Sequence, residues 1–147
     1  LGIGLYGVSS AKESISLTEA VELKTTIAQI RKVKKGASVG YGRAAILKKD
    51  TYVATIRIGY ADGFPRTLGN GRGEVLIRGK RYPTIGNVCM DMTMVDLGDH
   101  HQIQVDEEVL IFGKDFSVKE FAQRAITIPY EIMTGISSRV PRIYLSE

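Results

Sequence analysis

One tyrosine stands in a setting that suits acid–base chemistry, because glycines lie on both sides of it. Gly40 and Gly42 flank Tyr41 and allow a tight turn and the close approach of a ligand. A phenol has a reference pKa of about 10, so it acts near neutral pH only if cationic neighbours or a positively charged cofactor favour the phenolate. From its sequence context alone, Tyr41 is either an acid–base candidate or a tyrosine that occupies a turn.

A second tyrosine lies where a predicted strand gives way to an acidic, glycine-rich turn. Tyr60 is followed by Asp62 and Gly63, and Arg66 comes shortly after them. Loops at strand ends often carry binding and catalytic side chains. The same residues also suit an Asp-Gly turn with a packed tyrosine, and their spacing does not separate these two interpretations.

The sequence offers little for nucleophilic or metal chemistry. The single cysteine, Cys89, lies in an apolar run, and a catalytic thiol needs a positive environment or a histidine to form the thiolate. The two histidines, His100 and His101, instead lie in a polar turn near Asp96 and Asp99. These histidines and aspartates lack the spacing of a metal site. We therefore expect neither a Cys-His nucleophile pair nor a bound metal.

The segments that must position these residues read mainly as β-strands. In residues 52–58, Tyr52, Ala54 and Ile56 share one face, which predicts a core-facing side and a mixed side. Turns at residues 69–71 and 78–80 favour antiparallel pairing. We predict a mainly β fold, an antiparallel and nearly closed barrel with a few short helices. The predicted strands are residues 21–33, 52–58, 74–77, 88–97 and 108–112.

Two short helices are expected in the second half of the chain. Ser117 and Glu120 have the spacing of a capping box, in which each side chain satisfies a free amide at the start of a helix. The second helix is expected to begin near Pro129, since proline suits the first helical turn, and to run through Met133. Residues 139–144 then read as extended chain.

Length and composition predict one folded, soluble domain. The chain has 147 residues, 44% of them hydrophobic and 24% charged, which fits a single hydrophobic core. The formal net charge is +4, but the densest basic run, residues 31–35, reads as a solvated strand end or turn, so we expect no nucleic-acid partner. A single cysteine excludes an internal disulfide and fits a reducing cytosol. No apolar run reaches the roughly 20 residues of a membrane-spanning helix.

The first residues differ from the rest of the chain. Residues 1–7 form a glycine-punctuated apolar stretch, and the polar residues 9–14 follow. We expect residues 1–7 to be a strand from a preceding domain that enters a linker, with an edge strand of the same domain as the alternative. The chain begins with Leu1 rather than Met, which fits a part of a longer protein.

Five strings of residues, in this order, resemble the signatures of the C-terminal domain of alanine racemases. The resemblance covers nearly the whole chain, and the ordered set is specific although each string is weak alone. It implies that residues 11–147 form this β domain and that residues 1–10 are the end of an N-terminal barrel domain with its linker. The strings are Val39-Gly40-Tyr41-Gly42, Gly59-Tyr60-Ala61-Asp62-Gly63, Gly86-Asn87-Val88-Cys89-Met90-Asp91, Pro129-Tyr130-Glu131 and Arg139-Val140-Pro141-Arg142.

The resemblance implies a cofactor and a reaction. Members of this family use pyridoxal 5'-phosphate attached to a lysine of an N-terminal α/β barrel, and the cofactor ring spreads the charge of the deprotonated α-carbon. They interconvert L- and D-alanine for cell-wall peptidoglycan, in the cytoplasm and as homodimers. Racemisation removes a proton from one face and returns one to the other, so it needs two acid–base groups. The lysine is one, and the resemblance places the other, a tyrosine contributed by the partner subunit, at Tyr41.

The resemblance also implies roles for five further residues. Tyr60 matches a tyrosine that narrows the substrate entryway, and Arg66 matches an arginine of that entryway. Met90 matches a residue whose backbone amide helps to bind the substrate carboxylate, and Asp91 is its neighbour at the gate. Tyr130 matches a tyrosine that bonds to the cofactor phosphate.

The chain departs from the family pattern at two positions. The motif of the base usually begins with Ser where this chain has Gly40, and Asn87 replaces a frequent entryway arginine. Neither change removes a proton-transfer group, but the charge of the entryway and the range of substrates are left open. No residue here matches the cofactor lysine, so this chain alone is not expected to racemise alanine.

A two-domain dimer would press Tyr41, Tyr60 and Met90 against a partner's barrel, so we expect these residues to share one face. Two other interpretations stay open. One is the β domain of a pyridoxal-phosphate-dependent amino-acid decarboxylase, whose catalytic string of a cysteine and acidic residues is not found here. The other is a stand-alone β-barrel binding module that has lost catalysis. Fusion of the full-length protein to a cell-wall ligase is also left open.

Overall fold

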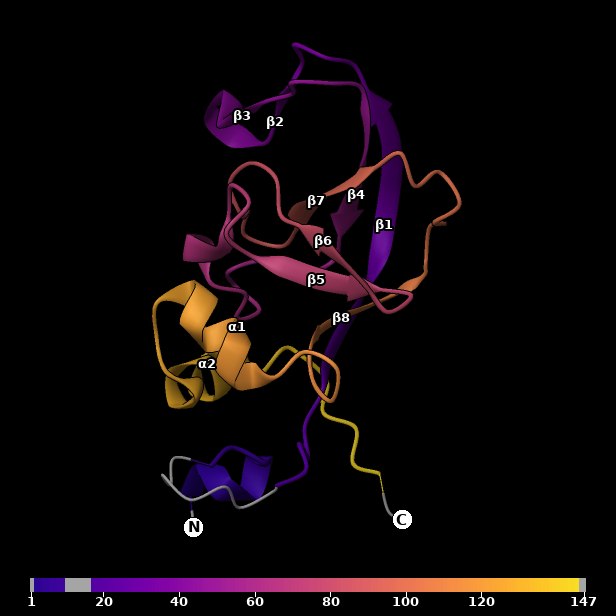
Figure 1. The fold of residues 1–147 in the computed structure, drawn as a ribbon. Coiled ribbons are helices and arrows are strands. Elements are labelled where there is room, and N and C mark those ends of the chain that lie inside the picture. The colour runs from indigo at the N-terminus through magenta and orange to yellow at the C-terminus, as the bar shows by residue number, and fades with distance from the viewer. Residues whose placement is uncertain (1, 10–16, 146–147) are drawn as a thin grey trace.

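The computed structural model describes residues 2–9 and 17–145, and within them antiparallel strands dominate, with two helices near the C-terminal end (Figure 1). Short 3₁₀ segments, labelled η, connect some of the strands. In chain order, the elements are η1 (Gly2–Tyr6), β1 (Leu23–Val33), β2 (Ser38–Val39), η2 (Tyr41–Arg43), β3 (Ala45–Ile46), β4 (Thr51–Ile56), η3 (Arg66–Leu68), β5 (Glu74–Ile77), β6 (Lys80–Pro83), β7 (Thr93–Gly98), β8 (Glu108–Phe112), α1 (Val118–Ala125) and α2 (Pro129–Gly135).

In the part of the chain that the structure describes, six strands form one antiparallel sheet that curls until its edges meet. The strand order is β6-β5-β8-β1-β4-β7. A bridge from Thr84, just after β6, to Val95 in β7 joins the two edges. This closure confirms the predicted antiparallel, nearly closed barrel. It also pairs backbone groups that an open sheet would leave free at its edges.

β1 belongs to both halves of this sheet. Its first residues pair with β8, whereas its later residues pair with β4. The register shifts between Ile27 and Gln29, at the change from one partner to the other. Such a bulge bends a strand and increases its twist, so it lets β1 turn a corner of the barrel.

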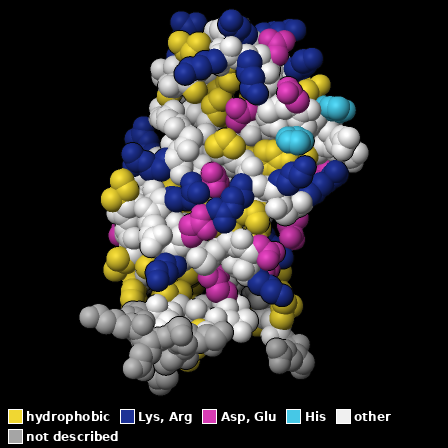
Figure 2. Space-filling view, viewed as in Figure 1, with side chains coloured by type: hydrophobic (Ala, Val, Ile, Leu, Met, Phe, Trp, Pro, Cys, Tyr) yellow, Lys and Arg dark blue, Asp and Glu magenta, His cyan; other side chains and the backbone are white. Residues whose placement is uncertain are grey.

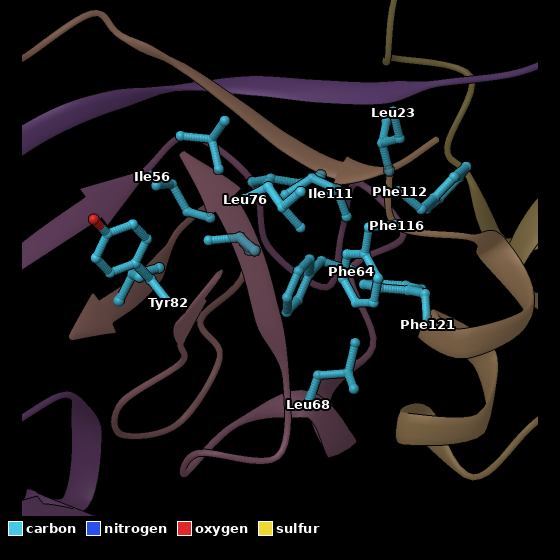
Figure 3. Packing of buried hydrophobic residues seen from close by; sticks show 14 of the residues in the cluster. Leu23, Ile56, Phe64, Leu68, Leu76, Tyr82, Ile111, Phe112, Phe116 and Phe121 are labelled. Atoms are coloured by element: carbon cyan, nitrogen blue, oxygen red, sulfur yellow. The ribbon is translucent and has the colours of Figure 1, made fainter. Parts of the chain in front are cut away.

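Apolar side chains from the sheet and from α1 fill the interior of the barrel. Ile56 of β4 is fully buried, as the predicted alternation requires. Phe121 of α1 packs edge-on against Phe64, with the ring centroids 5.6 Å apart. The Phe121 ring also contacts the rings of Phe112 and Phe116 (Figure 3). Burial of this apolar surface is the main source of favourable folding free energy, and it fixes α1 against the end of the barrel.

A further hydrophobic cluster lies on the outer face of the sheet. β2 and β3 pair with each other and form, with their neighbours, a flap that spans residues 36–47. Val39 and Leu47 of the flap cluster with Val53 of β4 and Met94 of β7, and Cys89 completes the group. Because successive side chains of a strand point to opposite faces, Val53 covers the side of β4 that faces away from the barrel core. β4 is therefore buried on both faces.

Both predicted helices are present. α1 begins after Ser117, whose side-chain oxygen accepts a hydrogen bond from the Glu120 N–H at 3.1 Å. The Glu120 carboxylate binds the Arg81 guanidinium on β6, with one N–O distance of 2.9 Å, so the structure shows one half of the capping box. α2 begins at Pro129 and extends to Gly135, as the proline signal predicts.

The prediction of a strand at the start of the chain is wrong. Residues 2–6 form the 3₁₀ segment η1, and Gly2 and Gly7 have positive φ angles that extended strands do not use. Ile3 and Val8 pack onto the main hydrophobic core. Most of the expected linker, at residues 10–14, lies outside the described residues, and the domain boundary at residue 10 stays a prediction.

Two further predicted segments differ in part. The strand expected at residues 88–97 begins only at Thr93, because residues 88–92 form a turn in which the Cys89 N–H donates to the Met92 carbonyl oxygen at 3.0 Å. Arg139 lies in a turn rather than in extended chain, and residues 141–145 have no regular secondary structure. Both differences concern segments that form local turns, held by the Cys89 N–H bond to the Met92 carbonyl oxygen and the Val140 N–H bond to the Ser137 carbonyl oxygen.

The basic run at residues 31–35 is a solvated strand end and turn, as predicted. Lys34 and Lys35 are exposed, and the Lys34 ammonium lies 3.0 Å from the Asp50 carboxylate. Figure 2 shows that Lys and Arg side chains gather over the end of the molecule that carries the flap. An exposed ion pair of this kind contributes little to stability. The basic run is therefore part of the solvated surface.

The C-terminal end of α1 holds a β-branched residue in an unfavourable backbone conformation. Ile126 has φ 61° and ψ 45°, in the left-handed region where glycine is the usual residue. Its side chain is 74% exposed, so its removal loses little burial. We expect Ile126→Gly to raise the free energy of unfolding of this chain by about 0.5 to 1 kcal/mol in urea unfolding, because the strain outweighs the added freedom of the unfolded chain.

Ile46→Gly is the matched control for that experiment. Ile46, in β3, is 67% exposed and is not among the described non-glycine residues with positive φ. Glycine should therefore lower the unfolding free energy there, since it adds freedom to the unfolded chain without relieving strain. Equal destabilisation by both substitutions would contradict the strain at Ile126.

Candidate functional site

Tyr41 lies on the flap, between β2 and β3, with its ring exposed to solvent. Gly40 precedes it with φ 77°, and a Cβ there would lie 3.0 Å from the Met94 Cε, so this position favours glycine. The Asn87 side-chain amide donates a hydrogen bond to the Tyr41 carbonyl oxygen at 3.2 Å, and the Asn70 amide donates to the Asn87 Oδ1 at 2.9 Å. These contacts hold the backbone of Tyr41 while its phenol faces outward.

Tyr60 and Met90 lie on two loops that are bonded backbone to backbone. The Tyr60 N–H donates to the Cys89 carbonyl oxygen, and the Ala61 N–H donates to the Met90 carbonyl oxygen, each at 3.0 Å. A Cβ on Gly59 would lie 2.3 Å from the Met90 oxygen, so this approach requires glycine. Tyr60 and Met90 are therefore held side by side.

Tyr41, Tyr60 and Met90 form one exposed surface, which we call the gate surface. Their side chains are 76%, 46% and 54% exposed, respectively. The stretch from Asn87 to Met90 joins them, because Asn87 bonds to the Tyr41 backbone while Cys89 and Met90 bond to the loop of Tyr60. The structure thus brings together the three residues that the sequence analysis expects on one face. That this face is an interface with a partner stays a prediction.

Two adjacent backbone amides of the gate surface are unused. In residues 2–9 and 17–145, no group accepts a hydrogen bond from the N–H of Met90 or of Asp91. Both residues lie in a bend, where successive N–H groups can converge on an anion. This arrangement suits a carboxylate.

Arg139, to which the sequence analysis assigns no role, links both loops of the gate surface to the segment after α2. Its Nε donates to Asp62 Oδ1 at 2.7 Å, and its Nη2 donates to Asp91 Oδ1 at 2.5 Å. The other Asp62 oxygen accepts from the Gly59 N–H at 2.8 Å, and the Asp62 carbonyl oxygen accepts from the Ser137 N–H at 3.1 Å. The carboxylates raise the pKa of Arg139 above its ordinary value, so the guanidinium stays charged.

Arg66 and Cys89 lie near the gate surface but differ in exposure. Arg66 begins η3 and is exposed, whereas Cys89 is buried in the cluster under the flap. Burial raises the pKa of the Cys89 thiol, and the positive charge of Arg66 offsets this only in part. A buried, protonated thiol is a poor nucleophile, so Cys89 contributes to the packing under the flap rather than to chemistry.

Tyr130 lies away from the gate surface. It is in the first turn of α2 and half exposed, and its hydroxyl is 3.9 Å from the position that a Cβ on Gly2 would take, so it borders η1. In Figure 1, α2 and the flap lie apart along the length of the molecule. The structure therefore does not bring Tyr130 together with Tyr41.

The histidines pack beside aromatic rings. His100 packs edge-on against Tyr82, with the ring centroids 5.6 Å apart, and His101 lies beside Tyr52. Within the described residues, no group of three or more His, Cys, Asp or Glu side chains could hold a metal ion. No helix in that part of the chain has the length and apolar character to cross a membrane.

Known proteins that resemble this chain are alanine racemases. Residues 20–144 match the family described as alanine racemase, C-terminal domain. The alanine racemase of Thermodesulfovibrio yellowstonii is 41% identical to this chain over 99% of its length, and the match covers 40% of that protein. The structure of the biosynthetic alanine racemase from Pseudomonas aeruginosa has a TM-score of 0.91 and 37% identity, and covers 99% of this chain and 41% of that one.

A second solved structure is that of alanine racemase from Bartonella henselae with covalently bound pyridoxal phosphate. It has a TM-score of 0.92 and 35% identity, and the match covers 98% of this chain and 40% of that chain. The chain thus spans about 40% of the length of the relatives that it matches. Because the family match extends over most of its residues, this chain belongs to the alanine racemase C-terminal domain family.

Proposed function

We propose that this chain is the C-terminal part of a pyridoxal-phosphate-dependent alanine racemase and supplies one of its two acid–base groups. The observation that carries the proposal is an exposed phenol, Tyr41, on an anchored flap whose surface also holds two unused amides. The relatives reported above are named alanine racemases, which favours this reaction over the decarboxylase and the binding module. The product, D-alanine, would serve cell-wall peptidoglycan, and location in the cytoplasm is part of the proposal.

The proposed chemical role of Tyr41 is proton transfer at one face of the α-carbon of alanine. Gly40 and Asn87 fix its backbone, while the exposed ring is open to a substrate that another domain carries. The phenolate accepts the α-proton of one enantiomer, and the phenol returns a proton to the same face when the other enantiomer reacts. The lysine that works on the opposite face is proposed to belong to the N-terminal barrel domain.

The substrate carboxylate is proposed to bind at the amides of Met90 and Asp91. These N–H groups have no acceptor within the described residues, so they are ready to donate to an anion. Tyr60 lies beside Met90 through the backbone bonds of their loops, so its ring narrows the approach. Arg66 adds a positive charge near this surface, which attracts a carboxylate.

Pyridoxal phosphate, when bound, supplies an electron-withdrawing ring that stabilises the deprotonated α-carbon. Tyr130 is the residue proposed to hold its phosphate, and it fits this role because its half-exposed hydroxyl donates no hydrogen bond within the described residues. α2, which carries Tyr130, and the flap, which carries Tyr41, lie apart along the molecule, and this separation favours contact with two different cofactors (Figure 1). We therefore propose a homodimer in which Tyr130 faces the cofactor of its own chain and Tyr41 faces that of the partner.

Tyr41→Phe in the full-length protein should keep the fold and the cofactor, because the ring remains and only the hydroxyl is lost. Loss of a positioned acid–base group typically slows a reaction by roughly a hundred- to ten-thousand-fold. Abstraction of the α-proton should suffer more for one enantiomer than for the other, since the lysine still serves the opposite face. Solvent-deuterium exchange at the α-carbon, followed separately from L- and D-alanine in single turnovers, measures this asymmetry.

Tyr52→Phe is the matched control, because it removes the same hydroxyl from a ring that packs beside Lys32 and His101 instead of on the gate surface. It should leave the exchange from both enantiomers within about twofold of the unmodified protein. Equal and undiminished exchange in Tyr41→Phe would show that Tyr41 is not the base.

The 147-residue chain by itself should have neither racemase activity nor the absorbance of bound pyridoxal phosphate. The reason is that its proposed share of the cofactor site is the single hydroxyl of Tyr130. Titration of the chain with the cofactor, beside the full-length protein as a positive control, tests this expectation. Stoichiometric cofactor attachment to a lysine of this chain would overturn the assignment of the cofactor to another domain.

A further inference from the structure

We propose that Arg139 is a positioning residue for substrate binding, which offsets part of the negative charge of Asp91 beside the free amide of Met90. The proposal rests on the proposed function, since it takes the substrate carboxylate to bind at that amide. Arg139 reaches the site from the turn after α2, through the two ion pairs described above. Within the described residues, no hydrogen bond or ion pair joins Arg139 to the flap or to Tyr41, so we take its effect to pass through the two aspartates.

The two carboxylates that bind Arg139 are not equivalent. Asp62 is 15% exposed and has both oxygens bonded, one to Arg139 and the other to the Gly59 N–H. Asp91 is 54% exposed, and within residues 2–9 and 17–145 its carboxylate has Arg139 as its sole partner. Asp62 is therefore the anchor that sets the position of the guanidinium, and Asp91 is the group whose charge the guanidinium balances.

The need for this balance follows from the position of Asp91 in the chain. It comes directly after Met90, so its carboxylate belongs to the residue next to the amide at which the substrate anion is proposed to bind. Like charges repel, and the repulsion opposes the binding of any carboxylate substrate. The Arg139 guanidinium offsets it at the one place where a substrate anion is needed.

The geometry also explains why the residue is arginine. The Nε and Nη2 atoms of one planar group point to two different carboxylates from two loops. A lysine has a single ammonium on a flexible stem. It therefore keeps the positive charge but cannot hold two carboxylates with two fixed N–H groups. The charge role and the bridging role can therefore be separated by substitution.

The test uses the full-length protein and steady-state kinetics with L- and D-alanine. Arg139→Gln should raise KM for both enantiomers by roughly two- to fivefold and change kcat less than twofold, because it weakens carboxylate binding and leaves proton transfer intact. The increase in KM should shrink at high salt, where exposed charges are screened. Arg139→Lys should raise KM less than Arg139→Gln does.

The decisive variant is Arg139→Gln combined with Asp91→Asn. If Arg139 acts by balancing charge, removal of the Asp91 charge should bring KM back to within about twofold of the unmodified protein, although the bridge between the loops is still absent. A purely structural role would give no recovery. Urea unfolding of each variant shows whether the fold is kept, and the Arg139→Lys comparison holds if Arg139→Gln is too unstable to assay.

An unchanged KM in Arg139→Gln, or a double variant that is no better than Arg139→Gln, would overturn this inference. Failure of the proposed function looks different. In that case the unmodified full-length protein does not racemise alanine, or Tyr41→Phe leaves its activity intact. The Arg139 variants therefore test this inference, whereas the unmodified protein and Tyr41→Phe test the proposed function.

Discussion

The burial of β4 on both of its faces is the constraint on which the barrel, the flap and the gate surface depend. Its inner side chains, such as Ile56, join the main core, and Val53 on the outer face anchors the flap. The same strand runs on into Gly59 and the loop of Tyr60. Because one strand carries all three, a shift of β4 would displace the core, the flap and the gate surface together. Rigid support of this kind suits the proton transfer that is proposed for Tyr41, since the rate of such a step depends on close geometry.

Hydrogen bonds to backbone groups help to set the relative positions of the residues on the gate surface. The Tyr60 N–H bonds to the Cys89 carbonyl oxygen, and the Asn87 side chain bonds to the Tyr41 carbonyl oxygen. Gly59 permits the close approach because it carries no Cβ. Tyr41, Tyr60 and Met90 take part in such bonds through their backbones, so their side chains remain exposed. Asn87 holds the backbone of Tyr41 in this way.

Local signals in the sequence predicted much of the fold, because strands bounded by glycines and helices with capping residues depend on near neighbours. β5 and β8 match their predicted bounds, and Ser117 and Pro129 start the helices. The turn at residues 88–92 was missed, since an apolar run reads equally well as a strand or as a buried loop. The role of Arg139 could not be predicted either, because its partners lie 77 and 48 residues away. One sequence carries no direct signal for such distant pairs.

The place of Arg139 in the chain has a consequence for the order in which the protein is made. Synthesis runs from the N-terminus, so Arg139 is added after every strand of the sheet and after both helices. Until it is added, Asp62 and Asp91 lie on the nascent chain without the guanidinium that bonds to both. The bridge between the loop of Tyr60 and the loop of Met90 therefore forms only after every strand that positions those loops has been synthesised.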